Sequence, residues 1–312
     1  MYTLITGGAG YIGSHVAKLM KGPLVVIDDL SHGDINNCKY GTFIKADITN
    51  IPELENVFKN YTFSTVIHIA GKAFVQESFS NIEEYYNVNV VGTINVLNMM
   101  VKYNVPNIIF SSSCSVYGNV SLLPITENTA RYPISPYGTT KKLCEDIIMN
   151  YSKVKNIKYI ILRYFNVSGN DTECEVRDTI YNRNRLIPTI INCCLNNEVL
   201  TINGNTYFTK DGTCVRNYIH VMDLANAHIK ALNFKYENLI CNVGTPDNYS
   251  IIEIINIVEK ILNKKINYIF KDKIQGDPDI VYCSNELAKN KLKLEIKYNI
   301  FSIITSYIAV FK

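Results

Sequence analysis

The glycine-rich segment LITGGAGYIG, residues 4–13, restricts the fold of this chain more than any other part of the sequence. A short apolar run ends here in Gly7, Gly10 and Gly13. Glycines at this spacing allow a tight turn between a strand and a helix, where the main chain can approach a diphosphate. The next apolar run ends at Asp28, whose carboxylate can accept hydrogen bonds from a ribose and would repel a 2′-phosphate. We therefore predict a dinucleotide site that takes NAD.

Short apolar runs alternate with helical segments through the first half of the chain. Six runs are bounded by polar or glycine-containing turns: YTLIT, PLVVID, TFIKAD, STVIHIA, NIIFSSS and KYIILRYF. This alternation is typical of an α/β fold, and it predicts a Rossmann-type, doubly wound parallel sheet. The run LICNV, residues 239–243, is expected to return a further strand to the sheet.

Two helix starts are predicted from capping residues. Asn81, with Glu84 three residues later, is interpreted as a capping box for a helix that runs through Met99 and Met100. Asp223 is predicted to be the N-cap of a later helix. Helices at these places support the doubly wound arrangement.

The chain after Phe165 changes character. It is dominated by loops, such as NVSGNDTECEVRD and TINGNTYFTKDGTCVRNY, and it ends in the apolar segment NIFSIITSYIAVF. We predict a smaller mixed α/β lobe that binds the substrate and ends in a buried helix. The expected division is 1–165 plus 216–243 for the NAD-binding Rossmann domain and 166–215 plus 244–312 for the smaller lobe.

Composition and charge argue against several classes of protein. The 31 basic and 28 acidic residues give a net charge of +3 without long blocks of like charge, so no nucleic-acid partner is expected. No apolar run reaches the roughly 18 residues of a membrane span, and the N-terminal segment does not resemble a secretory signal. The nine cysteines and five histidines lack the spacings of zinc sites. We expect a soluble, cytoplasmic protein with reduced cysteines, without a metal and without membrane contact.

The segment SPYGTTKK, residues 135–142, places Tyr137 and Lys141 four positions apart. Residues at this spacing share a helix face, and a lysine ammonium beside a phenol lowers the pKa of the phenol from its ordinary value of about 10. Ser113 stands at the end of the fifth apolar run, where open parallel sheets place their ligand sites. The three side chains are suited to hydride transfer beside a nicotinamide, with Tyr137 as the base. The alternative is a surface helix start and a turn serine.

Several longer motifs are shared with a known family. They are TGGAGYIGSH, VIHIAG, YYNVNVVGT, FSSSCSVYG, SPYGTTK, LRYFNVSG, DGTCVRNYIHVMDLA and GDPD. With these motifs the chain resembles the extended short-chain dehydrogenase/reductase family, and within it the UDP-glucose 4-epimerases. The resemblance implies epimerisation at C4 of a UDP-sugar through a transient 4-keto sugar, with bound NAD. It also implies a homodimer formed through the helices that begin near Asn81 and Tyr137.

The resemblance assigns site residues position by position. Those expected to bind NAD are Gly7, Gly10, Tyr11, Ile12, Gly13, Asp28, Asp47, Ile48, Ala70, Gly71, Asn89, Ser111, Tyr137, Lys141 and Phe165. Those expected to bind the sugar nucleotide are Ser113, Tyr137, Tyr164, Asn166, Arg216, Asp277 and Val281, and Arg185 and Lys273 are added to them as cations where the chain departs from the family. The expected catalytic residues are Ser113, Tyr137 and Lys141.

The sequence departs from the family at some of its coenzyme and substrate positions. The departures are Lys72, one place before the family's lysine; Arg185, in place of asparagine or histidine; Asn203, in place of an aromatic residue; and Ile274, in place of arginine. A nucleoside diphosphate needs charged hydrogen-bond donors. We therefore hypothesise that Arg216 binds it with help from Arg185 or Lys273.

Neighbouring activities can be weighed at the end of the fifth apolar run. Sugar-nucleotide dehydratases carry carboxyl groups there, whereas this chain has Ser113, Cys114 and Ser115, so elimination lacks its acid and base. Val281 matches the family position whose bulk limits the sugar pocket, so the resemblance implies room for an N-acetyl group, and the alternative is an ordinary core valine. Two alternatives stay open: an epimerase of another nucleotide sugar, such as a uronate or a pentose, and a non-catalytic, NAD-bound regulatory protein of the same fold.

Overall fold

A seven-stranded parallel sheet forms the centre of the larger part of the molecule. The computed structural model describes residues 1–178, 185–234, 237–274 and 277–311. The strands of the sheet are β1 (Tyr2–Thr6), β2 (Leu24–Asp28), β3 (Thr42–Lys45), β4 (Phe63–His68), β5 (Asn107–Ser113), β6 (Lys158–Tyr164) and β10 (Leu239–Val243). They lie in the order β10-β6-β5-β4-β1-β2-β3, and all neighbours pair in parallel. The predicted α/β sheet, including its strand at LICNV, is confirmed.

The order of the strands fixes the position of the ligand crevice. The chain winds from β1 through β2 to β3, and then returns to place β4, β5 and β6 on the other side of β1. In a sheet wound in this way, a crevice opens beyond the carboxyl ends of the strands where the winding reverses. That point lies between β1 and β4, so Gly7 and the loop of residues 69–74 meet there.

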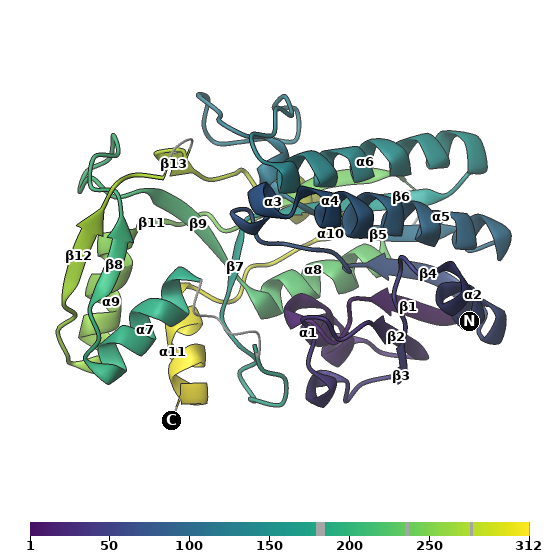
Figure 1. Ribbon diagram of the computed structural model, residues 1–312, viewed down its shortest axis with the longest axis horizontal. Coiled ribbons are helices and arrows are strands. Elements are labelled where there is room, and N and C mark those ends of the chain that lie inside the picture. The colour runs from purple at the N-terminus through teal and green to yellow at the C-terminus, as the bar shows by residue number, and fades with distance from the viewer. Residues whose placement is uncertain (179–184, 235–236, 275–276, 312) are drawn as a thin grey trace.

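Helices cover both faces of the sheet (Figure 1). They are α1 (Tyr11–Leu19), α2 (Ile51–Asn60), α3 (Glu77–Ser80), α4 (Ile82–Tyr85), α5 (Gly92–Lys102), α6 (Pro136–Lys155), α8 (Val221–Asn233) and α10 (Glu286–Leu292). One face packs against α2, α5 and α6, through residues such as Phe58 and Leu97. The other packs against α1, α8 and α10, through residues such as Val16 and Leu224. No helix within the described ranges is long and apolar enough to cross a membrane.

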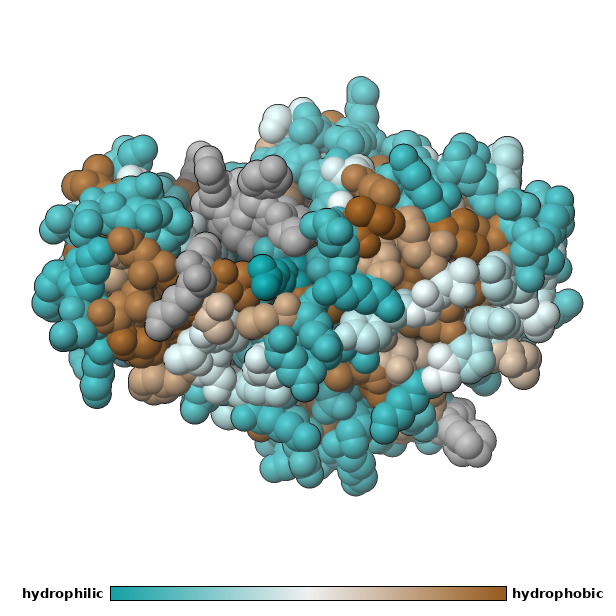
Figure 2. Space-filling view, turned by 90° about the horizontal axis from the view of Figure 1, so that it is seen from below, coloured by the Kyte–Doolittle hydropathy of each residue, from teal (hydrophilic) through white to brown (hydrophobic). Residues whose placement is uncertain are grey.

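A smaller lobe lies at the left of Figure 1 and contains two short sheets. Its elements are β7 (Asn166–Ser168), α7 (Leu186–Asn196), β8 (Leu200–Asn203), β9 (Val215–His220), β11 (Asn248–Ser250), α9 (Ile251–Leu262), β12 (Tyr268–Lys271), β13 (Ile280–Val281) and α11 (Ile300–Phe311). In the first sheet, β9 pairs with β7, β11 and β13, and in the second β8 pairs with β12. The predicted last helix, α11, is confirmed and packs with α7 and α9 through Ile303 and Ile304. From the side of α7 and α11, apolar side chains also gather on the surface of this lobe (Figure 2).

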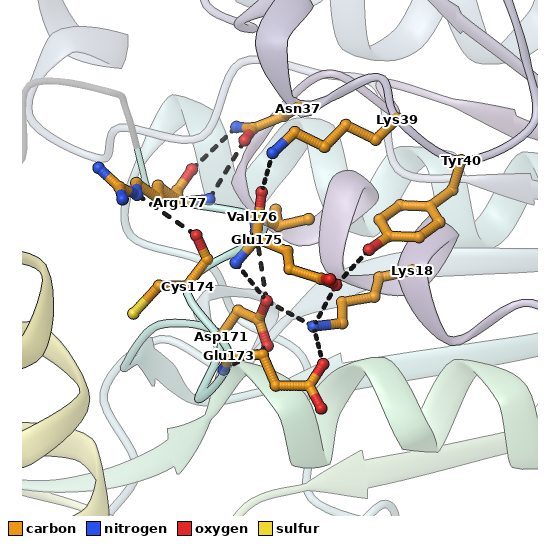
Figure 3. A network of polar contacts seen from close by, with 10 residues as sticks. All are labelled: Lys18, Asn37, Lys39, Tyr40, Asp171, Glu173, Cys174, Glu175, Val176 and Arg177. Carbon is orange, nitrogen blue, oxygen red and sulfur yellow. Dashed lines mark hydrogen bonds and ion pairs between the residues drawn. The ribbon is translucent and has the colours of Figure 1, made fainter.

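A strap of residues 170–178 follows β7 and is bound to α1 and to the segment after β2 (Figure 3). The ammonium of Lys18, on α1, lies 2.6–2.9 Å from three carboxylates of the strap, those of Asp171, Glu173 and Glu175. The side chain of Asn37 exchanges two hydrogen bonds with the main chain of Arg177. These contacts hold the strap beside the sheet.

The helix predicted to start at Asp223 starts two residues earlier, so that prediction is wrong. α8 begins at Val221. The ring of His220 caps it, because Nδ1 accepts a hydrogen bond from the main-chain amide of Met222 at 3.1 Å. Asp223 lies inside the first turn, where its carboxylate accepts hydrogen bonds from the main-chain amides of Lys297 and Tyr298. The acidic side chain therefore binds another segment instead of its own helix end.

The capping box predicted at Asn81 is also wrong, although the helical segment exists. Asn81 makes no capping hydrogen bond with its side chain. Glu84 is instead paired with Lys72, at 2.7 Å, and so does not return to the helix start. The segment continues from α4 through a π-helical stretch, Tyr86–Val91, into α5, which contains the predicted Met99 and Met100.

Candidate active site

The glycines after β1 form a turn that leaves no room for side chains. Gly7 has a φ of +71°, a left-handed conformation that favours glycine. A β-carbon at Gly13 would lie 2.1 Å from the main-chain oxygen of Gly7. α1 begins at Tyr11, so its unpaired amide groups are next to the turn. A turn of this kind fits the diphosphate of a dinucleotide.

Asp28 ends β2 beside this turn. Its carboxylate oxygens accept hydrogen bonds from the main-chain amides of Ala9, at 3.0 Å, and Leu30, at 2.9 Å. Burial raises the pKa of the Asp28 carboxyl, and these amides lower it in part. The carboxylate is therefore fixed in place, where it suits the ribose of a dinucleotide.

A pocket of about 390 Å³ lies along the carboxyl ends of the strands. The predicted coenzyme residues that line it are Gly7, Gly10, Tyr11, Ile12, Gly13, Asp28, Asp47, Ile48, Ala70, Gly71, Tyr137 and Lys141. Tyr164 and Arg185, which were predicted for the sugar nucleotide, line the same pocket. The structure thus joins most of the predicted coenzyme residues in one continuous site.

Three predicted coenzyme residues stand behind the pocket lining. The side-chain amide of Asn89 accepts from the main-chain amide of Lys72, at 2.8 Å, and donates to its oxygen, at 3.1 Å. The main-chain oxygen of Ser111 accepts a hydrogen bond from Lys141. Phe165 is buried in an apolar cluster. Asn89 and Ser111 therefore hold residues that line the pocket, Lys72 and Lys141, whereas Phe165 packs among apolar residues that do not line it.

α6 carries Tyr137 and Lys141 into the pocket. Ser135 caps this helix, since its hydroxyl accepts a hydrogen bond from an amide of the first turn at 3.1 Å. The two side chains are 5% and 4% exposed, so both lie out of bulk water. The ammonium of Lys141 donates to the main-chain oxygen of Ser111 at 2.9 Å. The predicted side-by-side placement on one helix face is present.

The electrostatics of this pair differ from the expectation drawn from spacing alone. Burial raises the pKa of Tyr137 well above its ordinary value, and the phenol of Tyr164 raises it further, while a hydrogen bond with Ser113 lowers it in part. Burial also lowers the pKa of Lys141. Ionisation of Tyr137 near neutral pH therefore requires more positive charge than Lys141 alone supplies, such as that of an oxidised nicotinamide.

Ser113 ends β5 next to Tyr137, which lines the coenzyme pocket, although Ser113 is not itself part of that lining. The register of β5 and β6 places it opposite Tyr164, and its side chain hydrogen-bonds that of Tyr137. Burial raises the pKa of the adjacent Cys114 to about 11, whereas Ser113 and the charge of Arg216 lower it in part. The positive charge of Arg216 therefore acts on the thiol of Cys114, the residue that follows Ser113.

Arg216 belongs to a set of polar contacts in the smaller lobe. Its guanidinium lies 2.7 Å from one oxygen of Asp277, and the hydroxyl of Tyr207 donates to the other oxygen, also at 2.7 Å. The ammonium of Lys273 lies 4.1 Å from the ring centre of Tyr207 and 2.6 Å from Asp279. Arg216 and Lys273 are thus connected through Asp277 and Tyr207, and together they offer two cations for a diphosphate.

Arg185 contacts the coenzyme side of the site. Its guanidinium carbon lies 4.2 Å from the ring centre of Tyr11, and Nη1 lies 2.8 Å from Asp178. The predicted cations therefore divide into two places, with Arg185 in one and Arg216 and Lys273 in the other.

Val281 and Asn166 lie on strands that flank β9. Val281 pairs with Arg216 in the register of β13 and β9. Asn166, on β7, donates from its side chain to the main-chain oxygen of Asn217 at 2.9 Å. Both predicted substrate residues are therefore next to the strand that carries Arg216.

Some charged residues of the site were not predicted. Lys72 and Glu84 line the coenzyme pocket and form an ion pair. The available signal was the lysine displaced by one place in the sequence. Glu145 lies four positions after Lys141 on α6, and this continued spacing could have identified it as a residue of the same buried face.

Known proteins are similar to this chain in both sequence and fold. The family described as "NAD dependent epimerase/dehydratase family" matches residues 3–244. A UDP-glucose 4-epimerase of Rhizobium meliloti (strain 1021) is 34% identical over 310 residues, 97% of this chain and 94% of that protein. UDP-arabinose 4-epimerase 1 of Arabidopsis thaliana is 35% identical over 317 residues, 95% of this chain and 76% of that protein. The crystal structure of UDP-glucose 4-epimerase from Brucella ovis in complex with NAD has a TM-score of 0.95 and 37% identity, covering 99% of this chain and 98% of that chain.

Proposed function

The chain belongs to the NAD dependent epimerase/dehydratase family, and on that premise we propose that it is an NAD-dependent enzyme that interconverts UDP-glucose and UDP-galactose at C4. The observation that carries this proposal is that Tyr137 and Lys141 line the glycine-turn pocket and that Ser113 hydrogen-bonds Tyr137. The relatives with the same architecture include 4-epimerases that are named for UDP-glucose and for UDP-arabinose.

Each of the three side chains has a role in moving the proton of the sugar 4-hydroxyl. Tyr137, as the phenolate, accepts that proton. Ser113 hydrogen-bonds Tyr137 and relays the proton. Lys141, fixed by the main chain of Ser111, supplies positive charge to the phenolate. The chemistry supplied by bound NAD is reversible hydride uptake from C4, so no net oxidation results.

The chain's own residues favour epimerisation over elimination. The positions after Ser113 are Cys114 and Ser115, which carry no carboxyl group. Burial also keeps Cys114 a thiol, since its pKa is raised to about 11. A 4-keto sugar in this pocket therefore lacks the acid and base that would remove water from it.

Arg216 and Lys273 are the residues that we assign to the diphosphate of the UDP-sugar. Their shared neighbour, Tyr207, and the carboxylates of Asp277 and Asp279 fix both cations in the smaller lobe. Arg185 stacks on Tyr11 at the coenzyme side, and so it is assigned to the wall between the two ligands.

A UDP-N-acetylhexosamine is a second candidate substrate. Val281 lies on β13 beside Arg216, and its short side chain restricts the sugar pocket less than a large aromatic residue would. This assignment concerns the width of the pocket and leaves the proposed chemistry at C4 unchanged.

Incubation with a panel of nucleotide sugars tests the proposal. The purified protein with NAD would be given UDP-glucose, UDP-N-acetylglucosamine, UDP-arabinose and UDP-glucuronate separately, and the products identified by NMR. We expect UDP-galactose from UDP-glucose. Conversion of the pentose or the uronate alone would replace the proposed substrate, and no turnover with any sugar would favour the non-catalytic alternative.

The proposal extends to a cytoplasmic homodimer. Each of the two helices expected at the interface has an exposed apolar side chain near its start, Ile82 for the first and Ile134 for the second. A sedimentation mass equal to one chain would contradict the dimer. Likewise, we propose a Rossmann domain of residues 1–165 plus 216–243 and a smaller lobe of residues 166–215 plus 244–312, with two exchanges at these bounds. β9 pairs within the smaller lobe, and α10 packs on the large sheet. Limited proteolysis can test this division.

A further inference from the structure

α6 carries a third buried charged residue on the face that holds the reactive pair. Tyr137, Lys141 and Glu145 follow one another at steps of four residues and therefore share one side of the helix. Glu145 has no exposed surface. A buried carboxylate is costly unless donors compensate for the loss of water, so a helix that keeps one must supply such donors.

Four donors surround the carboxylate of Glu145. Arg163, on β6, donates to both oxygens, at 2.9 and 2.7 Å, and Arg131 donates to one of them at 2.9 Å. The hydroxyl of Ser112 is the fourth donor. Ser112 immediately precedes Ser113 on β5 and is paired in register with Arg163. Glu145 thus joins α6 to the two strands that form the floor of the site.

Glu145 is also the anion that faces Lys141 among the described residues. The titratable side chains around Lys141 are Tyr137, Cys144 and Glu145 on α6 and His68 on β4. Burial raises the pKa of Cys144 and lowers that of His68 to about 3, so both are neutral near pH 7. Burial lowers the pKa of Lys141, whereas Cys144 and Glu145 raise it. The charge of Glu145 therefore opposes the effect of burial on the pKa of Lys141.

We propose that Glu145 is a positioning residue for the 4-epimerase reaction: its carboxylate, held by Arg163, Arg131 and Ser112, fixes α6 against β5 and provides the negative charge that faces the Lys141 ammonium. This inference rests on the proposed function. If Glu145 were only half of a structural ion pair, replacing Glu145 or Arg163 would change the pKa of Lys141 equally. The proposed role predicts unequal changes, because only Glu145 supplies negative charge near the Lys141 ammonium.

Two variants separate the electrostatic role from the structural one. Glu145→Gln removes the anion and breaks the ion pair, whereas Arg163→Gln breaks the same pair and keeps the anion. The control is Asp146→Asn. It also removes one negative charge from α6, but that carboxylate pairs with Arg131 and Lys142 and not with Lys141. The pKa of Lys141 is measured by NMR of lysine labelled with ¹³C at Cε, in full-length protein with NAD. The Lys141 signal is assigned by its loss in Lys141→Arg.

We expect Glu145→Gln to lower the pKa of Lys141 by about one unit. The alkaline limb of the kcat/KM profile should move to lower pH with it, because Lys141 acts only when protonated. Arg163→Gln and Asp146→Asn should produce no such fall. Equal effects of Glu145→Gln and Arg163→Gln, or an unchanged Lys141 titration in Glu145→Gln, would overturn the proposal.

A paired substitution keeps the test decisive if a single variant does not fold. Glu145→Gln with Arg163→Gln removes both charges of this pair, and Arg131 keeps Asp146 as its ionic partner. The pKa of Lys141 should still fall in this double variant, and an unchanged value would overturn the inference. The NMR titration does not require turnover, so a protein without epimerase activity but with the expected fall in pKa would reject the proposed function and leave the electrostatic coupling standing.

Discussion

Tyr137 lies in surroundings that oppose its ionisation. Burial raises its pKa, and Lys141, the cation on the same face of α6, is bound to a main-chain oxygen. The ring itself is held by packing, since it meets the ring of Tyr85 edge to face at 6.4 Å between centres. The hydroxyl and the ring therefore have separable roles, the first in proton transfer and the second in stability.

Removal of the hydroxyl tests this separation. In Tyr137→Phe the packing surface remains and the proton acceptor is lost, so we expect kcat to fall about 10³-fold with little change in the free energy of unfolding. UDP-galactose formation and urea unfolding would be measured side by side. Tyr151→Phe, on the same helix, removes an exposed hydroxyl bound to Asn98 and should retain full activity. A Tyr137→Phe protein with more than a tenth of the original rate would contradict the role of the phenol.

The sequence was informative about residues that are close together along the chain. The spacing of Tyr137 and Lys141 is a local property of one helix, and it predicted their common face correctly. The partner of the Lys141 ammonium is Ser111, thirty positions away, and no local pattern indicates it. In the same way Glu145 meets Arg163 only because β6 lies beside β5. Contacts of this kind follow from strand order and could not be predicted from spacing.

Among the elements, the strap of residues 170–178 depends on Lys18. The Lys18 side chain is only 9% exposed and lies among three carboxylates of the strap (Figure 3). Burial would raise the pKa of Asp171, but Lys18 and two main-chain amides bring it below its ordinary value. The buried Asp171 is thus the carboxylate that most needs the ammonium.

Replacement of Lys18 leaves the buried carboxylate of Asp171 without its cation. We expect Lys18→Met to lower the free energy of unfolding by about 3 kcal/mol, measured by urea denaturation at pH 7. The matched control is Lys59→Met, which removes an exposed pair with Glu55 and should cost less than about 1 kcal/mol. Equal losses in the two variants would show that the strap is not held by Lys18.

Strands and helices were predicted correctly where a single sequence pattern determines them. Six apolar runs became six strands, because burial on both faces of a parallel sheet requires such runs. Helix starts were predicted less well, since polar side chains near a helix end have other partners available. Asp223 binds the main chain before α11, and Glu84 binds Lys72. A capping motif in the sequence does not reveal these competing partners.

At the scale of the whole molecule, the two parts of the fold divide the predicted ligands between them. The glycine turn, Asp28 and the α6 pair belong to the parallel sheet and its helices, whereas Arg216 and Lys273 belong to the smaller lobe. The glycine turn, Asp28 and the α6 pair were predicted from their spacing, Arg216 from its place in a family motif, and Lys273 as an additional cation where the chain departs from the family. It did not predict the pairing of β8 with β12, which lie more than sixty positions apart and bring Lys273 beside Tyr207.

Four histidines are buried across these layers, in positions unrelated to the proposed chemistry. Burial lowers the pKa of His15 and His228 to about 4 and that of His68 and His220 to about 3. All four are therefore neutral in the folded protein at pH 5, whereas the same side chains in the unfolded chain titrate near 6.5. Asp223 acts in the opposite direction, since burial raises its pKa to about 6.

These shifts predict that the fold is sensitive to acid. Between pH 6.5 and about 4 the unfolded chain binds more protons at each buried histidine, so the free energy of unfolding falls as the pH falls, by about 1.4 kcal/mol per pH unit for each proton. Asp223 offsets one of the four, because its protonation stabilises the folded state in this range. Between pH 6.5 and pH 5, about 1.5 pH units, three net protons lower the free energy of unfolding by about 6 kcal/mol. This is comparable with the whole stability of many domains. Urea unfolding at pH 7.0, 6.0 and 5.0 should show this decline, with the same slope after exposed His32 is replaced by glutamine. A free energy of unfolding that stays constant over this range would mean that the buried imidazoles take up protons without opening the fold.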